Sequence, residues 1–159
     1  PRHPNRGPSL HKLAQAQAVK TARRSSGDAI TRTTQVYIAD TLGELGVFFA
    51  LSPIVFLGGS FGQEGGHNPY EPANFETALV HGPHVKNFSD AYAALRLAGA
   101  AVQVEDPSDL GGVLVSLIRT DQAGVMGQAG LAFMKETQNC TVTTADLITE
   151  ALGESRACV

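Results

Sequence analysis

The densest group of residues able to do chemistry lies in the stretch GGSFGQEGGHNPYE, from Gly58 to Glu71. Its five glycines permit tight turns and close approach of a ligand to the backbone. Asn68 suits a helix N-cap, Pro69 the first helical position, and Glu71 the acid of a capping box. Such a helix start attracts a phosphate, and the carboxylate can accept hydrogen bonds from ribose hydroxyls. The same three residues also serve as capping chemistry with no ligand at all.

Two other junctions combine polar residues with a helix start. In ADTLGEL, Thr41 and Glu44 predict a second capping box. Gly43 is unexpected in a first helical turn, where glycine costs up to about 1 kcal/mol relative to alanine. It therefore predicts close approach of something to the backbone. Arg2 and His3, in the opening PRHP, are candidates for a phosphate contact, although a lone arginine near a terminus is usually solvated.

The chain carries no recognisable catalytic motif. It has no Gly-x-Ser-x-Gly and no phosphate-cradling Gly-x4-Gly-Lys. His67, His81 and His84 follow strand-like runs, but their spacing is not that of metal ligands. We therefore expect no metal site and no catalytic residue, and the residues alone indicate a nucleotide-binding domain without its own chemistry.

Short β-type runs alternate with helical patterns along most of the chain. Strands are expected at residues 20–25, 35–39, 53–59, 79–83 and 100–104. Helices are expected at residues 9–19, 40–51, 70–78, 87–99, 106–120, 121–137 and 144–152. This alternation implies βαβ units, and the runs PIVFLGG and LVHGP lack the polar alternation of a one-sided sheet. The predicted fold is a Rossmann-like α/β domain, with a parallel sheet flanked by helices.

Composition narrows the class of protein. A length of 159 residues suits one domain over 1–159, and 43% hydrophobic with 17% charged residues excludes a disordered chain. The net charge of −3 excludes a strongly basic nucleic-acid-binding surface. Cys140 and Cys158 lack metal-ligand spacing and indicate reduced thiols. The most apolar segment, 47–59, is shorter than the roughly 20 residues of a membrane-spanning helix.

Four motifs also resemble a known family. They are PRHPNR, ADTLGELGVFFALSPIVFLGGS, GGHNPYEPA and HGPHVKNFSDAY. In this order and at these separations they resemble the carboxy-terminal half of bacterial 3-deoxy-D-manno-octulosonic acid (Kdo) transferases, most strongly over residues 36–92. The resemblance implies one lobe of a GT-B glycosyltransferase that transfers Kdo from CMP-Kdo to the lipid A precursor. That reaction belongs to lipopolysaccharide biosynthesis, at the cytoplasmic face of the inner membrane.

The resemblance also implies a division of labour. This lobe would hold the CMP-sugar donor, while the absent amino-terminal lobe would supply the acceptor site, the membrane contact and the general base. The isolated lobe is then expected to be soluble and inactive, with no cofactor besides the donor substrate. By resemblance, the CMP contacts fall on Pro1, Arg2, Leu42, Gly43, Glu44, Asn68, Pro69, Tyr70 and Glu71.

Three positions depart from the family pattern. Asn5 replaces an acidic residue, Leu42 stands where methionine is common, and Tyr70 where leucine or isoleucine is common. They affect local packing, and none removes a charge or a glycine from the implied site. Two alternatives stay open on the residues alone. One is a GT-B enzyme that uses a UDP-sugar, and the other is a nucleotide-binding module without transferase activity.

Overall fold

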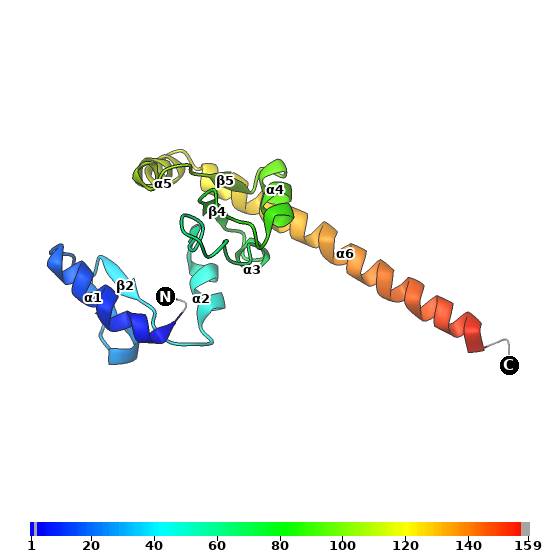
Figure 1. Cartoon of the computed structure of the whole chain (residues 1–159), viewed down its shortest axis with the longest axis horizontal. Helices are drawn as coiled ribbons and strands as arrows, with labels where there is room; N and C mark the ends of the chain where they lie inside the picture. Colours follow the sequence, from blue (N-terminus) through cyan, green and yellow to red (C-terminus); the bar gives the residue numbers. More distant parts are fainter. Residues whose placement is uncertain (2, 157–159) are drawn as a thin grey trace. The chain divides into compact units, whose positions relative to one another are not determined.

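The computed structural model describes residues 1 and 3–156, with the backbone alone for 138–142 and 153–156. The chain divides into two compact units, Pro1–Leu45 and Gly46–Val159. Figure 1 colours the first unit blue to cyan and the second cyan to red. Each unit has its own parallel sheet.

The first unit is a small α/β element built around two strands. In chain order it contains η1 (Pro4–Arg6), α1 (Gly7–Ala16), β1 (Thr21–Arg23), η2 (Arg24–Ser26) and β2 (Val36–Ile38). The strands pair in parallel, with Ala22 opposite Tyr37. Helix α1 contacts both strands, and Ala22 and Ile38 are buried. This arrangement brings the carboxyl ends of β1 and β2 side by side.

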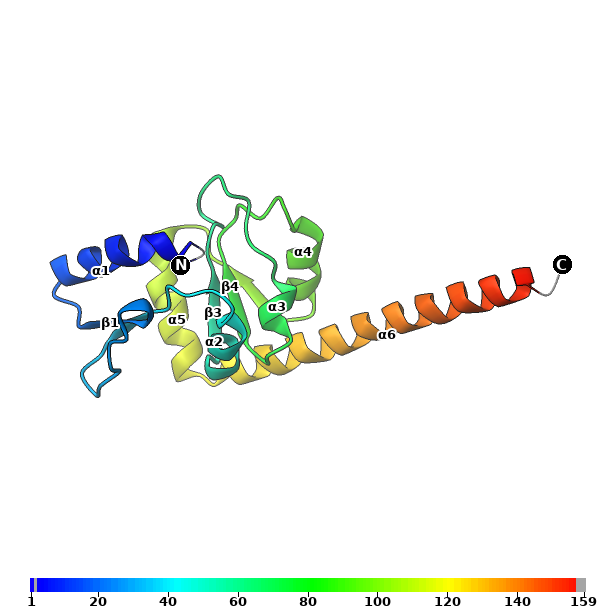
Figure 2. The ribbon, with the colours of Figure 1, turned by 90° about the horizontal axis from the view of Figure 1, so that it is seen from below.

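The second unit carries the main sheet. Its elements are α2 (Leu45–Leu51), β3 (Ile54–Leu57), α3 (Tyr70–Ala73), β4 (Ala78–His81), α4 (Ser89–Leu97), β5 (Ala101–Gln103), η3 (Pro107–Asp109), α5 (Leu110–Arg119) and α6 (Gln122–Arg156). The strand order is β3-β4-β5, and both pairs are parallel. Figure 2 shows the strands running in one direction, with the loops after β3 and β4 leaving the sheet at the same end.

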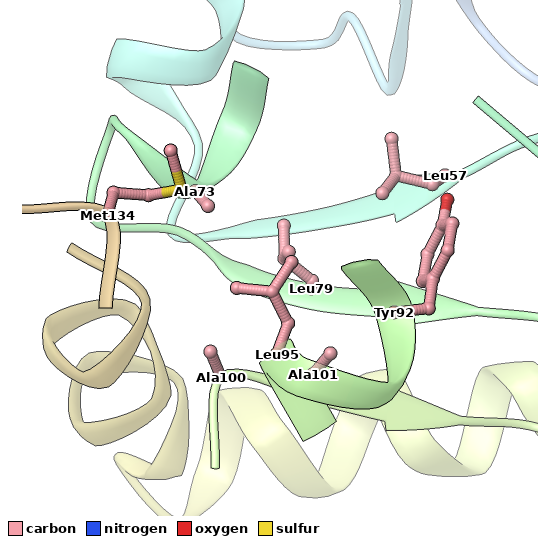
Figure 3. Packing of buried hydrophobic residues seen from close by; sticks show 8 residues of the cluster. All are labelled: Leu57, Ala73, Leu79, Tyr92, Leu95, Ala100, Ala101 and Met134. Carbon is pink, nitrogen blue, oxygen red and sulfur yellow. The ribbon is translucent and has the colours of Figure 1, made fainter. Parts of the chain in front are cut away.

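Strand β4 is buried on both faces because helices cover the sheet on both sides. Leu79 points into one core, which includes Tyr92 and Leu95 of α4 and Met134 of α6 (Figure 3). The residues on either side of Leu79 pack into a second core with α5 and the start of α6. Residues of a strand alternate between its faces, so one short apolar strand supplies both cores. The prediction of strands covered on both faces is confirmed for β4, whereas β3 is half-buried except at Leu57.

The helices begin and end where local chemistry requires. Helix α4 buries Ala91, Tyr92 and Leu95, which share one helical face, and it is followed by Gly99 with φ +76°. The first turns of α6 contact β4, α3 and α5, and Figures 1 and 2 show the rest extending beyond the sheet. No helix in the described part of the chain combines the length and the apolar character needed to cross a membrane.

All five predicted strands form, and the parallel α/β fold is confirmed. Four helix predictions were wrong in extent. The helix expected over 40–51 begins only at Leu45, and the one expected over 70–78 ends at Ala73. The two expected over 121–137 and 144–152 are one helix, since no proline or glycine interrupts the segment between them.

Leu79→Ala tests the assignment of the main core. The Leu79 side chain is fully buried, so removing most of it should lower the free energy of unfolding by about 2–5 kcal/mol. Leu97→Ala is the matched control, because Leu97 is 92% exposed and should change stability by less than about 0.5 kcal/mol. Urea denaturation of both variants measures the difference. Equal losses of stability would contradict this core.

Candidate functional site

A buried serine joins the two loops that leave the main sheet. The Ser60 hydroxyl donates to the Leu57 carbonyl at 2.6 Å and accepts from the Gly82 amide at 2.8 Å. The Ser60 carbonyl in turn accepts from the His84 amide at 2.8 Å. Ser60 therefore holds the loop after β3 and the loop after β4 against each other, at the sheet edge where parallel α/β folds bind ligands.

Several positions in these loops require glycine, either because of their backbone conformation or because a side chain would not fit. A Cβ on Gly82 would lie 2.4 Å from the Ser60 carbonyl oxygen, so only glycine fits there. Gly65 and Gly66 have φ of +82° and +79°, a region that side chains disfavour. A Cβ on Gly65 would also lie 2.8 Å from the Asn87 side chain. Backbone conformation and contacts within the protein thus account for Gly65 and Gly66, which the sequence had associated with a ligand, and for Gly82.

Asn87 links the loops a second time. Its side-chain amide donates to the Glu64 carbonyl at 2.8 Å, and its backbone amide donates to the Gly65 carbonyl at 3.0 Å. On the other side, the Tyr92 hydroxyl donates to the His67 carbonyl at 2.8 Å. The loop after β3 is therefore attached along its length to the loop after β4 and to α4.

Between these cross-linked loops lies an open pocket of about 400 Å³. Its lining residues are Gly62, Gln63, Gly65, residues 83–86 and Ser89. The volume falls within the range of small-molecule sites, about 300–1,000 Å³. Sequence reasoning had named His84, but it missed Gln63, Lys86 and Ser89, because no local pattern shows that two loops meet.

The predicted site residues around α3 differ from one another in burial and in hydrogen bonding. The Asn68 side chain accepts from the Tyr70 amide at 3.0 Å, but Pro69 and not Asn68 directly precedes α3, and Pro69 makes no side-chain cap bond, so the predicted N-cap position is off by one residue. Pro69 is fully buried, and the Tyr70 ring stacks on Phe133 at 6.4 Å between centroids. Glu71 is exposed and its carboxylate has no bonding partner within residues 1 and 3–156, so the predicted capping-box bond is absent. Asn68 and Glu71 thus offer an amide and a carboxylate, and half-buried Tyr70 carries a hydroxyl.

His81 is the buried imidazole at the end of β4. Its Nδ1 donates to the Gly82 carbonyl at 2.7 Å, its ring packs on Tyr92, and its Nε2 has no partner among the described residues. Burial lowers the pKa of His81, although the bond to Gly82 opposes that effect. The ring is therefore kept neutral. In the described part of the chain, no cluster of three or more His, Cys, Asp or Glu could hold a metal ion.

A separate polar cluster lies at the carboxyl edge of the first unit. The Glu44 carboxylate accepts from Arg24 Nη2 at 2.7 Å and from Arg24 Nε at 3.1 Å, and it also accepts from the Thr41 hydroxyl. The hydrogen bonds from Arg24, then that from Thr41, lower the pKa of Glu44 to about 2 against a smaller effect of burial. Glu44 is thus held as an anion by a two-pronged arginine contact.

Asp40 completes this cluster from the end of β2. It is 3% exposed and receives the Ser25 amide at 2.9 Å, the Ser25 hydroxyl at 2.7 Å and Arg23 Nε at 2.9 Å. Burial acts to raise the pKa of Asp40, but the two Ser25 bonds and the Arg23 charge outweigh it, and the pKa lies below its ordinary value. A Cβ on Gly7 would collide with this carboxylate, so α1 can begin here only with glycine.

The predicted capping box in ADTLGEL is wrong. Helix α2 begins at Leu45, after both Thr41 and Glu44, and these two bond to each other through their side chains. Gly43 lies in the bend before the helix with φ +81°, and a Cβ there would meet nothing within 4 Å. Its backbone conformation, rather than crowding, accounts for the glycine.

The remaining predicted contacts belong to the first unit. Leu42 is 76% exposed beside Gly43, and Pro1 is exposed at the start of the chain. Arg2 lies outside the described residues, as does Cys158. Arg24 was missed as a site residue, although the local basic run KTARRS was the signal that could have identified it.

Comparison with known proteins gives a consistent set of relatives. No family model matches the chain. It is similar to the 3-deoxy-D-manno-octulosonic acid transferase of Rickettsia conorii, with 32% identity over 155 residues, covering 96% of this chain and 33% of the relative. The corresponding protein of Bordetella pertussis is 33% identical over 155 residues, covering 96% and 36%. The chain therefore spans about a third of the length of these relatives.

One solved structure matches in both sequence and fold. It is the crystal structure of the C-terminal CMP-Kdo binding domain of WaaA from Acinetobacter baumannii. The two chains are 32% identical, with a TM-score of 0.74 over 82% of this chain and 70% of the other. Unlike the longer relatives, this domain is therefore matched over most of its own length.

Arg24→Ala tests the anionic state of Glu44. Without the guanidinium, the pKa of Glu44 should rise from about 2 toward its ordinary 4.5, because Thr41 alone remains to stabilise the charge. Carbon-13 NMR titration of the Glu44 carboxyl group measures this shift. In the parent chain the pair should stabilise the fold above pH 4.5, and this contribution should be lost as the pH falls through about 2.

Arg32→Ala is the control for this prediction. It removes the same charge from an exposed position in the same unit, and Arg32 has no ion-pair partner within the described residues. Its Glu44 titration should match that of the parent. If the parent Glu44 titrates near 4.5, or if both variants shift it equally, then the Arg24 contact does not hold the carboxylate.

Proposed function

The chain belongs to the 3-deoxy-D-manno-octulosonic acid transferase family, and we propose that it is the part of such an enzyme that binds the donor, CMP-Kdo. The observation that carries this proposal is the match to the CMP-Kdo binding domain of Acinetobacter baumannii, at 32% identity and a TM-score of 0.74. The site geometry agrees with it, because the predicted contacts at residues 42–44 and 68–71 lie after strands β2 and β3, where α/β folds bind nucleotides.

The activity belongs to the whole enzyme in this proposal. The complete protein would transfer Kdo from CMP-Kdo to the lipid A precursor during lipopolysaccharide synthesis, at the cytoplasmic face of the inner membrane. A lobe outside this chain would supply the acceptor site, the membrane contact and the general base, since a base must lie within hydrogen-bond reach of the acceptor hydroxyl. The donor lobe itself would contribute no catalytic residue and need no cofactor.

Around α3, the proposal assigns the nucleotide to Asn68 and the residues that follow it. Glu71 is exposed and unpaired among the described residues, so its carboxylate is available to accept from the ribose hydroxyls. Because α3 has only four residues, its dipole adds little to phosphate binding. Buried Pro69 and half-buried Tyr70 would then contribute backbone atoms and shape rather than side-chain polarity.

In the first unit, the proposal assigns a second set of contacts to Leu42, Gly43 and Glu44, with Pro1 and Arg2 near the chain start. Arg24 already occupies one side of the Glu44 carboxylate. A carboxylate oxygen accepts more than one hydrogen bond, so Glu44 retains capacity for a hydroxyl of the ligand. The left-handed bend at Gly43 presents backbone without a side chain beside it.

A titration with CMP tests the proposal. Addition of CMP to the isotopically labelled chain should shift the backbone amide NMR signals of Gly43, Glu44, Asn68, Tyr70 and Glu71; Pro69 has no amide proton. UMP should bind more weakly, and AMP more weakly still. Preference for UMP would favour an enzyme that uses a UDP-sugar. Shifts confined to other residues would contradict the proposed site.

Glu71→Ala should weaken CMP binding most. A charge-assisted hydrogen bond to ribose contributes about 1.5–3 kcal/mol, or roughly 10- to 150-fold in affinity. Glu76→Gln is the charge control, because Glu76 is another exposed carboxylate on the same segment. Asn68→Ala removes the bond to the Tyr70 amide and should cost about 0.5–2 kcal/mol of stability with a smaller loss of affinity. Calorimetry well below the unfolding temperature separates these effects.

The opposite ranking would refute the ribose role. If Glu71→Ala binds CMP as tightly as the parent chain while Asn68→Ala does not, the carboxylate at position 71 has no part in recognition. The bond between Asn68 and the Tyr70 amide would then position the ligand through the backbone alone.

A further inference from the structure

The pocket between the two cross-linked loops is not used by the nucleotide contacts proposed above. None of its lining residues belongs to the segment from Asn68 to Glu71 or to the first unit. It lies beyond the carboxyl ends of β3 and β4, and its walls come from both loops. The nucleotide site lies at the same edge of the sheet. A donor bound there has a second part besides its nucleotide, and that part also needs a binding site.

The charge of the lining favours an anion. Lys86 lines the pocket, is exposed, and has no ion-pair partner among the described residues. No carboxylate lines it. The nearest ones along the chain are Glu64, which lies against Gly62, and Asp90, which accepts a long bond of 3.4 Å from Ser89. The pocket thus offers one free ammonium group to a ligand.

The other polar groups suit hydroxyls. His84 Nδ1 lies 3.0 Å from the Gly62 carbonyl oxygen and 3.2 Å from that of Phe61. A carbonyl only accepts, so Nδ1 carries a proton, and Nε2 of an uncharged imidazole is then an acceptor. Gln63 and Ser89 add an amide and a hydroxyl, which both donate and accept. One cation with several neutral hydrogen-bonding groups matches a polyhydroxylated acid.

The pocket is also held in shape before any ligand arrives. Its two walls are joined by the bonds from Asn87 to the carbonyls of Glu64 and Gly65, and by that from the His84 amide to Ser60. Walls fixed in this way lose little conformational freedom on binding, which favours affinity.

We propose that this pocket binds the sugar acid of the donor, with the Lys86 ammonium paired to its carboxylate and with His84, Gln63 and Ser89 facing its hydroxyls. This inference rests on the proposed function, since it takes the ligand to be CMP-Kdo. As its name states, 3-deoxy-D-manno-octulosonic acid is a sugar acid, so one molecule of the donor brings a carboxylate in addition to the phosphate of CMP. The pocket then separates recognition of the sugar from recognition of the nucleotide.

The test is an NMR titration of the labelled 159-residue chain with free Kdo, and in parallel with CMP, inorganic phosphate and a neutral hexose. Kdo should shift the amides of Gly62, Gly65, Lys86 and Ser89, and added salt should weaken its binding. Lys86→Met should lower the affinity for Kdo by roughly 10- to 150-fold, the range of a charge-assisted hydrogen bond. Lys86→Arg should retain most of it.

Lys135→Met is the matched control, because it removes the same charge from an exposed position on α6 away from the pocket. It should bind Kdo like the parent chain. Glu64→Gln removes a carboxylate next to the pocket and should leave binding unchanged or tighter.

Three results would overturn the inference. They are the absence of Kdo shifts at the pocket, equal binding of Kdo and inorganic phosphate there, and movement of the same amides by CMP alone. The CMP titration reports on the nucleotide site, because the amide signals of that site appear in the same NMR spectra. If CMP shifts Asn68, Tyr70 and Glu71 while Kdo leaves the pocket unmoved, the sugar assignment fails and the proposed function stands. If neither ligand shifts any signal, both fail.

Discussion

The functional edge of the main sheet depends on the contact between Ser60 and Gly82. Both hydrogen-bonding positions of the Ser60 hydroxyl are used, toward Leu57 and toward Gly82, and the contact is too close for any side chain at position 82. It joins the first turns after β3 and β4, so the two loops leave the sheet together. Every later link between them, from His84 and Asn87, is possible because this one brings the loops into register. The pocket is a consequence of that register.

The same strand that anchors the loops also supplies the cores. β4 is central in its sheet, and its residues alternate between a core under α3 and α4 and a core under α5. His81 ends this strand, packs on Tyr92, and Tyr92 bonds to the carbonyl of His67 in the loop after β3. A continuous set of contacts thus runs from core to loop. The position of the segment from Asn68 to Glu71 is therefore set by packing rather than by the short helix α3 alone.

The two units differ in whether the charged side chains discussed above are paired. In the first, Arg23 pairs with Asp40 and Arg24 with Glu44, and these contacts together with hydrogen bonds from Ser25 and Thr41 favour the ionised carboxylates. In the second, Glu71 and Lys86 have opposite charges and no ion-pair partner among the described residues. Exposed groups without partners suit recognition of a ligand, because no existing bond must be broken to make the new one. Paired groups suit the support of a loop, as the Arg24 contact does for the segment that carries Gly43.

The sequence by itself determined the parallel α/β class, the position of all five strands and the family, because these follow from hydrophobic runs and short motifs that are local in the chain. It misjudged where helices begin and end around Gly43 and Ala73, since one left-handed residue can stop a helix that propensity would continue. Only the tertiary structure decided that Arg24 holds Glu44 and that Lys86 shares a pocket with Gln63. Those pairs lie about twenty residues apart along the chain, and no local pattern encodes which loops fold against each other. It also decided why glycine stands at positions 65 and 82, because the atoms that a Cβ there would meet belong to another segment of the chain.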